Sequence, residues 1–352
     1  MSQLFKGDVT NNVVELNLQA AAVNIGSSSY GLGGTNNGEI RVVHNGDIVQ
    51  GSGFYDAGSS LAGNDMKGLV IGTSCTSIGN TAFYFCSALT GSLSILDSVT
   101  TIGNNAFNNC SGLTGTLTLG NSVTTIGGGA FNNCIGLTGD LVIPDSVTII
   151  GNVAFIFCTS LTGDLVIPNS VTSIGSDCFS GCSSLTSLTL PINPSFNTIE
   201  ARTFRDCTSM TGNLFIPSNV TAIDSGAFER CSFTGNLNIP DTVTSIGTFC
   251  FTSNNFTSVT IGSGLTAIPN GLLFLCASMT GTLVLPATTS SVGNNAFNGC
   301  AFTRIEYYRT SPPAQATNVF AGGNNATEIH VPAASSWVAG STWNGLTVIK
   351  DL

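Results

Sequence analysis

The chain has 352 residues, of which only 8% are charged, and its net charge at pH 7 is −10. No lysine or arginine lies between Lys67 and Arg202. This argues against nucleic acid and against anionic membrane surfaces as partners, because both are recognised by basic side chains. No apolar run reaches 18 residues, so no membrane insertion is predicted.

Residues 1–66 do not share the pattern of the rest of the chain. Val14, Leu16 and Leu18 alternate with polar residues and predict a strand. The segment Ile40–Val49, with Asn45-Gly46 at its centre, predicts a hairpin with a type I′ turn. We expect a β-rich N-terminal module that caps the following coils. Whether it also docks onto other particle or surface proteins, or merely caps, is left open.

Residues 67–300 repeat one motif, I-G-x-x-A-F-x-x-C, in ten strict or looser copies separated by 22–25 residues. A fixed period of this length predicts a solenoid. The copies begin at Ile78, Ile102, Ile126, Ile150, Ile174, Ile199, Ile223, Ile246, Ile268 and Val292.

Residues 141–162 illustrate what one repeat should form. Leu141 and Ile143 alternate with an outward residue and predict a short strand. A second extended run ends at Ile150, and the apolar spacing within Asn152–Cys158 fits one helical turn. A single unit cannot bury its apolar side, but stacked copies can.

One phenylalanine per repeat is expected to stack in the core, with Leu273 taking that place once. The row is Phe83, Phe107, Phe131, Phe155, Phe179, Phe204, Phe228, Phe251 and Phe297.

Nine of the twelve cysteines also share one position of the repeat, and Asn254 fills it in the tenth copy. We expect reduced core thiols, with disulfides between neighbouring coils as the alternative. Metal binding is disfavoured because no C-x-x-C pair occurs. The nine are Cys86, Cys110, Cys134, Cys158, Cys182, Cys207, Cys231, Cys276 and Cys300.

The motif S-V-T-x-I-G-x-x-A-F-x-x-C-x-x-L-T, as in residues 98–114 and, with Cys178 for Ala, 170–186, resembles BspA-type leucine-rich repeats. The resemblance covers residues 69–332. It implies a mostly β, curved, right-handed leucine-rich-repeat solenoid of about ten coils of 22–25 residues. Proteins of this type are usually surface-exposed adhesion or recognition proteins, so no enzymatic activity is implied.

Residues 301–352 should supply the C-terminal repeats and a cap. Arg304–Tyr307 and Glu328–Pro332 repeat the strand motif. The ending resembles the C-terminal closure of BspA-type proteins, with Trp337 and Trp343 as aromatic lids. The functional alternative is that these two side chains are exposed and bind a ligand.

The repeats lack the residues of common catalytic sites. The two histidines, His44 and His330, lie outside them, so no histidine triad or metal cluster is expected there. Asp140 and Asp164 occupy equivalent positions of adjacent coils. Repeat registry explains this pair, and a Ca²⁺ site between the two carboxylates is the alternative. We predict no catalytic residue, no cofactor and no assigned metal site.

The outward residue of each strand forms the candidate ligand-binding face, because side chains alternate across a strand. Most of this row is small or β-branched, and variation is concentrated in its second half. We therefore assign a candidate site to Phe215, Asn238, Glu306 and His330, with the insertion Pro191–Asn197 as the alternative location. The row is Val70, Ser94, Thr118, Val142, Val166, Thr189, Phe215, Asn238, Thr260, Val284, Glu306 and His330.

Together these patterns predict a non-enzymatic recognition or adhesion protein that binds a protein or glycan receptor on a cell surface. The N-terminus, MSQLFKGDVTNN, does not resemble a signal peptide. This feature and the separate N-terminal module favour the exterior of a virus particle, as a tail fibre or spike. A cellular surface adhesin and a purely structural component without a ligand are the alternatives. Assembly into a homo-oligomer is left open.

Overall fold

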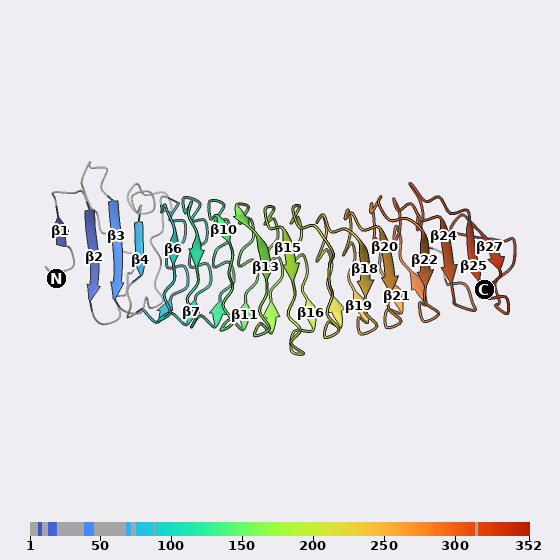
Figure 1. Ribbon diagram of the computed structural model, residues 1–352, viewed down its shortest axis with the longest axis horizontal. Helices are drawn as coiled ribbons and strands as arrows, with labels where there is room; N and C mark the ends of the chain where they lie inside the picture. Colours follow the sequence, from blue (N-terminus) through green and yellow to red (C-terminus); the bar gives the residue numbers. More distant parts are fainter. Residues whose placement is uncertain are drawn as a thin grey trace. The chain divides into compact units, whose positions relative to one another are not determined.

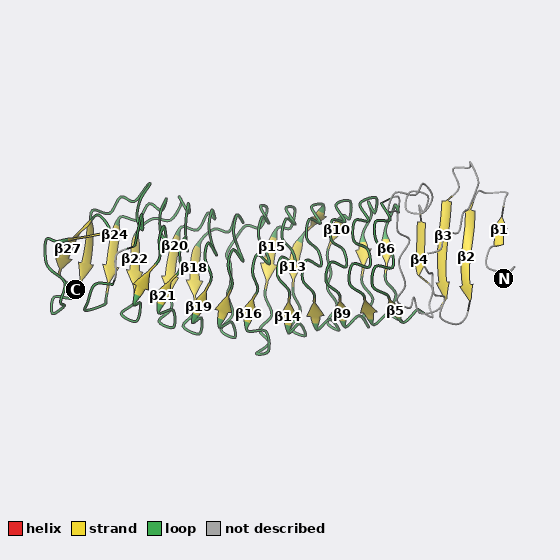
Figure 2. Ribbon diagram, turned by 180° about the vertical axis from the view of Figure 1, so that it is seen from behind, coloured by secondary structure: helices red, strands yellow, loops and turns green. Residues whose placement is uncertain are grey.

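The structure is a computed structural model that describes residues 6–8, 13–19, 39–45, 68–71, 75–87, 89–313 and 316–352. The chain divides into two compact units, residues 1–186 and 187–352. Within the described ranges every regular element is a β-strand (Figures 1 and 2). In the same ranges we find no helix with the length and apolarity needed to span a bilayer. The predicted, mostly β repeat solenoid is confirmed.

The first four strands of unit 1 form one sheet in the order β1-β2-β3-β4. β1 is antiparallel to β2, whereas β2, β3 and β4 are parallel. The strand predicted around Val14–Leu18 is confirmed as part of β2. The predicted hairpin is represented only by its first strand, β3, because residues 47–49 lie outside the described residues. The strands are β1 (Lys6–Asp8), β2 (Val13–Gln19), β3 (Glu39–Asn45) and β4 (Gly68–Ile71).

The coils of unit 1 stack in the register that the repeat predicts. Five short strands form a parallel sheet in which Ile78, Ile102, Ile126, Ile150 and Ile174 are successive partners. They are β5 (Ser77–Ile78), β7 (Thr101–Ile102), β9 (Thr125–Ile126), β11 (Ile149–Ile150) and β14 (Ser173–Ile174).

A second set of strands lies on the other side of each coil of unit 1. They are β6 (Leu93–Ser94), paired with β8 (Leu117–Thr118); β10 (Gly139–Asp140), paired with β12 (Leu161–Thr162); and β13 (Asp164–Val166). Residues 141–143 alternate between buried and exposed as predicted. The paired strand of that repeat is β10, two residues earlier, so the predicted strand bounds were wrong there.

Unit 2 has the same architecture. Its longest sheet has the order β22-β24-β25-β27-β26, so the strand motifs within residues 301–352 form further coils. Further strands of unit 2 pair in parallel as β16-β17-β19, β18-β20 and β21-β23. The strands are β15 (Ser187–Thr189), β16 (Thr198–Ile199), β17 (Ala222–Ile223), β18 (Asn236–Ile239), β19 (Ser245–Ile246), β20 (Ser258–Ile261), β21 (Ala267–Ile268), β22 (Thr282–Leu285), β23 (Ser291–Val292), β24 (Arg304–Tyr307), β25 (Glu328–Val331), β26 (Thr342–Trp343) and β27 (Leu346–Lys350).

The phenylalanine row forms the core as predicted. From Phe83 to Phe179 in unit 1, successive rings lie 5.0–5.5 Å apart between centroids and within 14° of parallel. In unit 2 the Phe228 ring lies 5.5 Å from the rings on either side of it in the row, and Phe297 stacks on Phe320 at 5.6 Å. Phe320 extends the row one coil beyond the prediction. Offset stacking of buried rings adds to the free energy gained by burial alone.

The C-terminal tryptophans close this core. Trp337 and Trp343 are buried, and their rings lie 5.9 Å apart. The Trp337 indole also donates a 3.0 Å hydrogen bond to the carbonyl of Arg309. The lid prediction is confirmed, and the alternative of exposed, ligand-binding tryptophans is wrong.

The helical turn predicted at Asn152–Cys158 is wrong. The N–H groups of Val153, Phe155 and Phe157 donate to carbonyls of the next coil at 2.8–2.9 Å, while those of Ile156 and Cys158 donate to the carbonyl three residues before. A helix would instead direct its interior N–H groups to carbonyls four residues earlier. In this segment every second N–H donates to the next coil. Val153 and Phe157 adopt left-handed φ values of 52° and 59°.

The cysteine row links the coils through hydrogen bonds of the thiols. All twelve cysteines are buried thiols, as predicted. The Sγ atoms of Cys110 and Cys134 donate at 3.0 Å to the carbonyls of Phe83 and Phe107 in the preceding coil, and Cys158, Cys182, Cys231, Cys276 and Cys300 repeat the arrangement. Asn254 performs the same role through its amide, 2.8 Å from the Phe228 carbonyl.

Truncating one ring of the core row should destabilise the protein strongly. We expect Phe155→Ala to lower the free energy of unfolding by about 3–5 kcal/mol, because it leaves a cavity between two stacked rings. Phe157→Ala is the matched control, since this ring in the same turn is 50% exposed, and it should cost less than half as much. Urea unfolding of both variants measures the difference, and equal losses would contradict the stacking register.

The left-handed backbone conformation of Val153 should be strained, and a residue that tolerates this conformation should relieve the strain. Asn105 and Asp177 hold the same conformation in other coils of unit 1, and short polar residues tolerate it better than a β-branched one. We expect Val153→Asn to raise the free energy of unfolding by about 1 kcal/mol. The control Val142→Asn, on an exposed position outside the left-handed region, should give no gain in urea unfolding. A gain in both variants would show that the backbone conformation is not the cause.

The buried thiols should be unreactive until the protein unfolds. Burial raises the pKa of Cys86, Cys134, Cys182 and Cys276 to about 12, so almost no reactive thiolate exists at pH 8. We expect iodoacetamide to modify none of the twelve cysteines in the native protein and all twelve in denaturant without reductant, as counted by mass spectrometry. Incomplete labelling in denaturant would reveal disulfides instead.

Candidate functional site

The outward strand row predicted from alternation is present in both units. In unit 1, Ser94, Thr118, Val142 and Val166 are exposed, and in unit 2 the same holds for Thr189, Phe215, Asn238, Thr260 and Val284. The side chain of Val70 lies outside what the structure describes. Glu306 is half-buried and His330 is buried, so the row changes character at the C-terminal coils.

Phe215 is the most exposed aromatic side chain among the described residues, with 67% of its surface accessible. It stands between Leu214 and Ile216, which are both buried. This segment lies against the next coil through the bridge between Asn213 and Thr234. The alternation therefore fixes the outward direction of the Phe215 ring.

Asn238 occupies the corresponding outward position of the next coil, on β18. Its direct partner across the ladder is Thr260 on β20. The Asn238 side chain is exposed and forms no hydrogen bond with any described residue, so its amide is available to a ligand. Phe215 and Asn238 thus present an aromatic ring and an amide on neighbouring coils.

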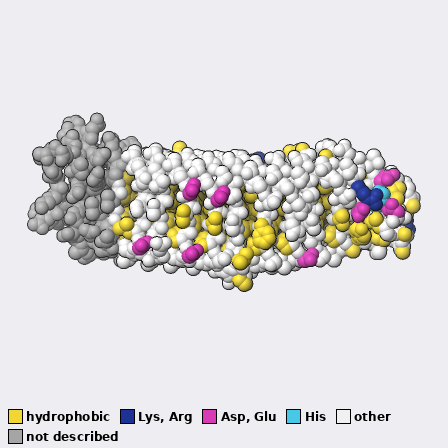
Figure 3. Space-filling view, viewed as in Figure 1, with side chains coloured by type: hydrophobic (Ala, Val, Ile, Leu, Met, Phe, Trp, Pro, Cys, Tyr) yellow, Lys and Arg dark blue, Asp and Glu magenta, His cyan; other side chains and the backbone are white. Residues whose placement is uncertain are grey.

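Glu306 and His330 are cross-strand partners on β24 and β25, in a cluster of charged groups at the C-terminal coils (Figure 3). Arg304 Nε donates to Glu306 Oε1 at 2.7 Å, and the Tyr308 hydroxyl donates to Glu306 Oε2 at 3.2 Å. The charge of Glu306 raises the pKa of the Tyr308 phenol, and the hydrogen bond to Glu306 raises the pKa of Arg304. Glu306 is thereby fully engaged within the protein.

His330 lies between the carboxylate of Asp351 and the guanidinium of Arg304. Its Nδ1 lies 2.9 Å from both carboxylate oxygens of Asp351, and its Nε2 lies 3.0 Å from Nη1 of Arg304. A guanidinium can only donate, so Nε2 accepts and the proton of a neutral imidazole sits on Nδ1, facing Asp351. With 8% of its surface exposed, His330 connects β24, β25 and the chain end rather than offering a free side chain.

The four residues of the candidate site therefore form two separate pairs. Phe215 and Asn238 are exposed on neighbouring coils, while Glu306 and His330 are cross-strand partners that both contact Arg304. The coils that carry Thr260 and Val284 lie between the pairs, as the strand order shows. The structure therefore pairs Glu306 with His330 and places Phe215 and Asn238 on adjacent coils, but it does not bring all four residues together.

The insertion Pro191–Asn197 belongs to the loop between β15 and β16, which protrudes beyond the loops that follow it in unit 2 (Figure 1). Its Ile192 is 63% exposed. The amide of Asn219 donates to the carbonyls of Pro191, Asn193 and Phe196, and so holds the loop to the next coil. The sequence pattern does not predict this interaction, although Asn219 stands in an N-V-T sequence.

Asp140 and Asp164 each meet a threonine of the following coil. Thr186 Oγ1 donates to Asp164 Oδ1 at 2.9 Å, and Thr162 Oγ1 lies 3.5 Å from Asp140 Oδ1. Within the described residues, no group of three or more His, Cys, Asp or Glu side chains is placed to hold a metal ion.

The profile of the BspA type leucine rich repeat region matches the chain with six copies, over residues 76–211, 148–280 and 197–327. These ranges together cover well over half of the chain. No curated protein matches it.

Solved structures of leucine-rich repeat proteins resemble the chain. A leucine rich cell surface protein from Faecalibacterium prausnitzii is 23% identical, over 89% of this chain and 78% of that protein, with a TM-score of 0.47. A leucine-rich repeat protein of T. pallidum is 25% identical, over 66% and 88%, with a TM-score of 0.42. One from Bacteroides ovatus is 19% identical, over 94% and 93%, with a TM-score of 0.45.

Proposed function

Because the chain belongs to the BspA-type leucine-rich repeat family, we propose that it is a non-enzymatic recognition protein that adheres to a protein receptor on a cell surface. The repeats form a regular scaffold, and the residues that vary on its outward strand face give it a binding surface. The contact residues are Phe215 and Asn238. Glu306 and His330 serve as positioning residues that order the C-terminal coils.

The observation that carries this proposal is the exposure of Phe215. Leaving a phenylalanine ring in water costs roughly 1.5–3 kcal/mol compared with burying it, and the neighbouring row positions mostly hold threonine or valine. Aromatic side chains are enriched at protein interfaces and often carry much of their binding energy. Few charges occur on this face, so we expect the binding to depend weakly on salt.

Such a protein acts outside the cell that makes it. Both exterior placements, on a cell envelope or on a virus particle, fit a protein that meets a receptor by its surface. Immunodetection in purified particles and in envelope fractions decides between them.

The contact residues can be tested by substitution. We expect Phe215→Ser to reduce the amount of fluorescently labelled protein bound to a panel of bacterial and mammalian cells by at least tenfold. Val142→Ser is the matched control, because Val142 is equally exposed on the same row of unit 1, and it should bind normally. Thermal unfolding of both variants should match that of the original protein.

Two outcomes would overturn the assignment. Undiminished binding of the Phe215→Ser variant would remove Phe215 from the contact surface. Binding that survives this substitution but is lost when residues 191–197 are shortened would move the contact to the insertion.

A further inference from the structure

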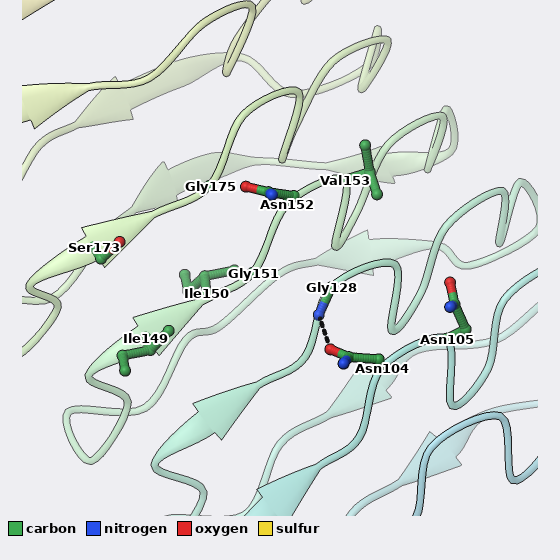
Figure 4. A pocket seen from close by; sticks show the side chains of 10 residues that line it. All are labelled: Asn104, Asn105, Gly128, Ile149, Ile150, Gly151, Asn152, Val153, Ser173 and Gly175. Atoms are coloured by element: carbon green, nitrogen blue, oxygen red, sulfur yellow. Dashed lines mark hydrogen bonds between the residues drawn. The ribbon is translucent and has the colours of Figure 1, made fainter.

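A ladder of turn side chains in unit 1 is interrupted at one coil, and a depression opens there (Figure 4). In the coils before the gap, Asn80 Oδ1 accepts the N–H of Asn104, and Asn104 Oδ1 accepts the N–H of Gly128, both at 2.7 Å. After the gap, Asn152 Oδ1 accepts the N–H of Ser176 at 3.0 Å. Gly128 has no side chain, so the Asn152 N–H has no partner among the described residues.

The depression is shallow and largely open to solvent. Its volume is about 540 Å³. Both polar and apolar groups line it, including Asn104, Asn105 and Asn152 with Ile149 and Val153. Figure 4 shows these side chains around the empty position at Gly128.

The side-chain amides of the depression present donors rather than acceptors. The amide oxygens of Asn104 and Asn152 accept hydrogen bonds from backbone N–H groups. The Asn108 amide donates to Asn105 Oδ1 at 2.8 Å. Because each amide oxygen accepts a hydrogen bond, the orientation of each amide is fixed. The NH₂ groups of the three amides have no described partner. Together with the Asn152 N–H, they form a surface that requires acceptors from its ligand.

The acceptor should be a neutral group. No lysine or arginine occurs between Lys67 and Arg202, so nothing in this stretch compensates the charge of an anion. Ile149, which is 46% exposed, and Val153 offer apolar contact beside the donors. A carbonyl that carries a methyl group matches both features.

We propose that this depression binds the acetamido group of a neutral N-acetylated sugar. The carbonyl oxygen of the sugar accepts from the Asn152 N–H, and its methyl group contacts Ile149. Ring oxygens and hydroxyls accept from the NH₂ groups of Asn104 and Asn105. This glycan site lies in unit 1 and does not depend on the protein-binding face assigned to Phe215 in unit 2.

Gly128→Asn tests the proposal by restoring the ladder. A Cβ at Gly128 would lie 3.3 Å from its nearest neighbour, the Asn152 carbonyl, whereas at Gly127 or Gly151 it would lie within 2.6 Å of backbone. The φ of Gly128 is not left-handed, so asparagine fits there as it does at Asn104. The new amide oxygen should occupy the Asn152 N–H and fill the depression without unfolding the chain.

The measurement is the shift of the Asn152 amide signal in ¹⁵N-labelled full-length protein during titration with N-acetylglucosamine. We expect saturable binding by the original protein, at least tenfold weaker binding by Gly128→Asn, and no matching shift with glucose. Val142→Ser, at an exposed position of unit 1 outside the depression, is the control and should bind N-acetylglucosamine normally. A melting temperature of Gly128→Asn equal to or above that of the original protein shows that the variant is folded.

Several results would overturn the proposal. Absence of binding by the original protein would leave the depression to water. An equal response to glucose would show that the acetamido group is not read, and an equal response to sodium acetate would show that the donors select an anion. Unchanged binding by Gly128→Asn would place the sugar elsewhere.

Discussion

The architecture depends on hydrogen bonds that run from each coil to the next. The turn arm is the segment of each repeat that corresponds to residues 152–158. In it, every second N–H donates to a carbonyl of the following coil. The short parallel strands form hydrogen bonds between coils in the other parts of the repeat. These bonds fix one register. Side chains at the same repeat position must then lie on top of one another, which is why the phenylalanine rings stack nearly parallel.

The same constraint explains which substitutions within a repeat position are tolerated. The cysteine position has to supply a donor to a phenylalanine carbonyl of the preceding coil, and a thiol or an amide can do this. Asn254 meets the Phe228 and Phe251 carbonyls through its NH₂ group, as the neighbouring Cys231 meets Phe204 through its thiol. Chemical identity at this position matters less than the presence of a donor of suitable size in a buried place.

The period of the motif predicted the solenoid, the register and most of the core, because all three depend on identity between coils. The turn arm could not be predicted in the same way. The spacing of Ala154, Phe155 and Cys158 suits both a helical turn and the observed arm, and the two differ only in where the N–H groups donate. Phe320 was missed because the coil it belongs to lacks the Ile-Gly start of the motif.

The candidate site was predictable only to the extent that it depends on local alternation. Alternation placed Phe215 and Asn238 outward, and both are exposed. It also placed His330 outward, but Asp351 and Arg304 come from other strands or the chain end and enclose its ring. The role of Gly128 likewise could not be predicted from the sequence alone. Only the hydrogen bonds formed by Asn104 and Asn152 in the adjacent coils show which bond a side chain at position 128 would have formed.

The coil-to-coil bonds also determine how the protein would respond to tension. Neighbouring coils are joined by bonds between residues about 24 positions apart, so a pull on the chain loads one interface at a time. Each coil that detaches releases a segment of roughly 80 Å when extended, while the coils behind it keep their own bonds. An attachment held by such a chain under shear would lengthen in steps and dissipate work at each one, instead of failing in a single event.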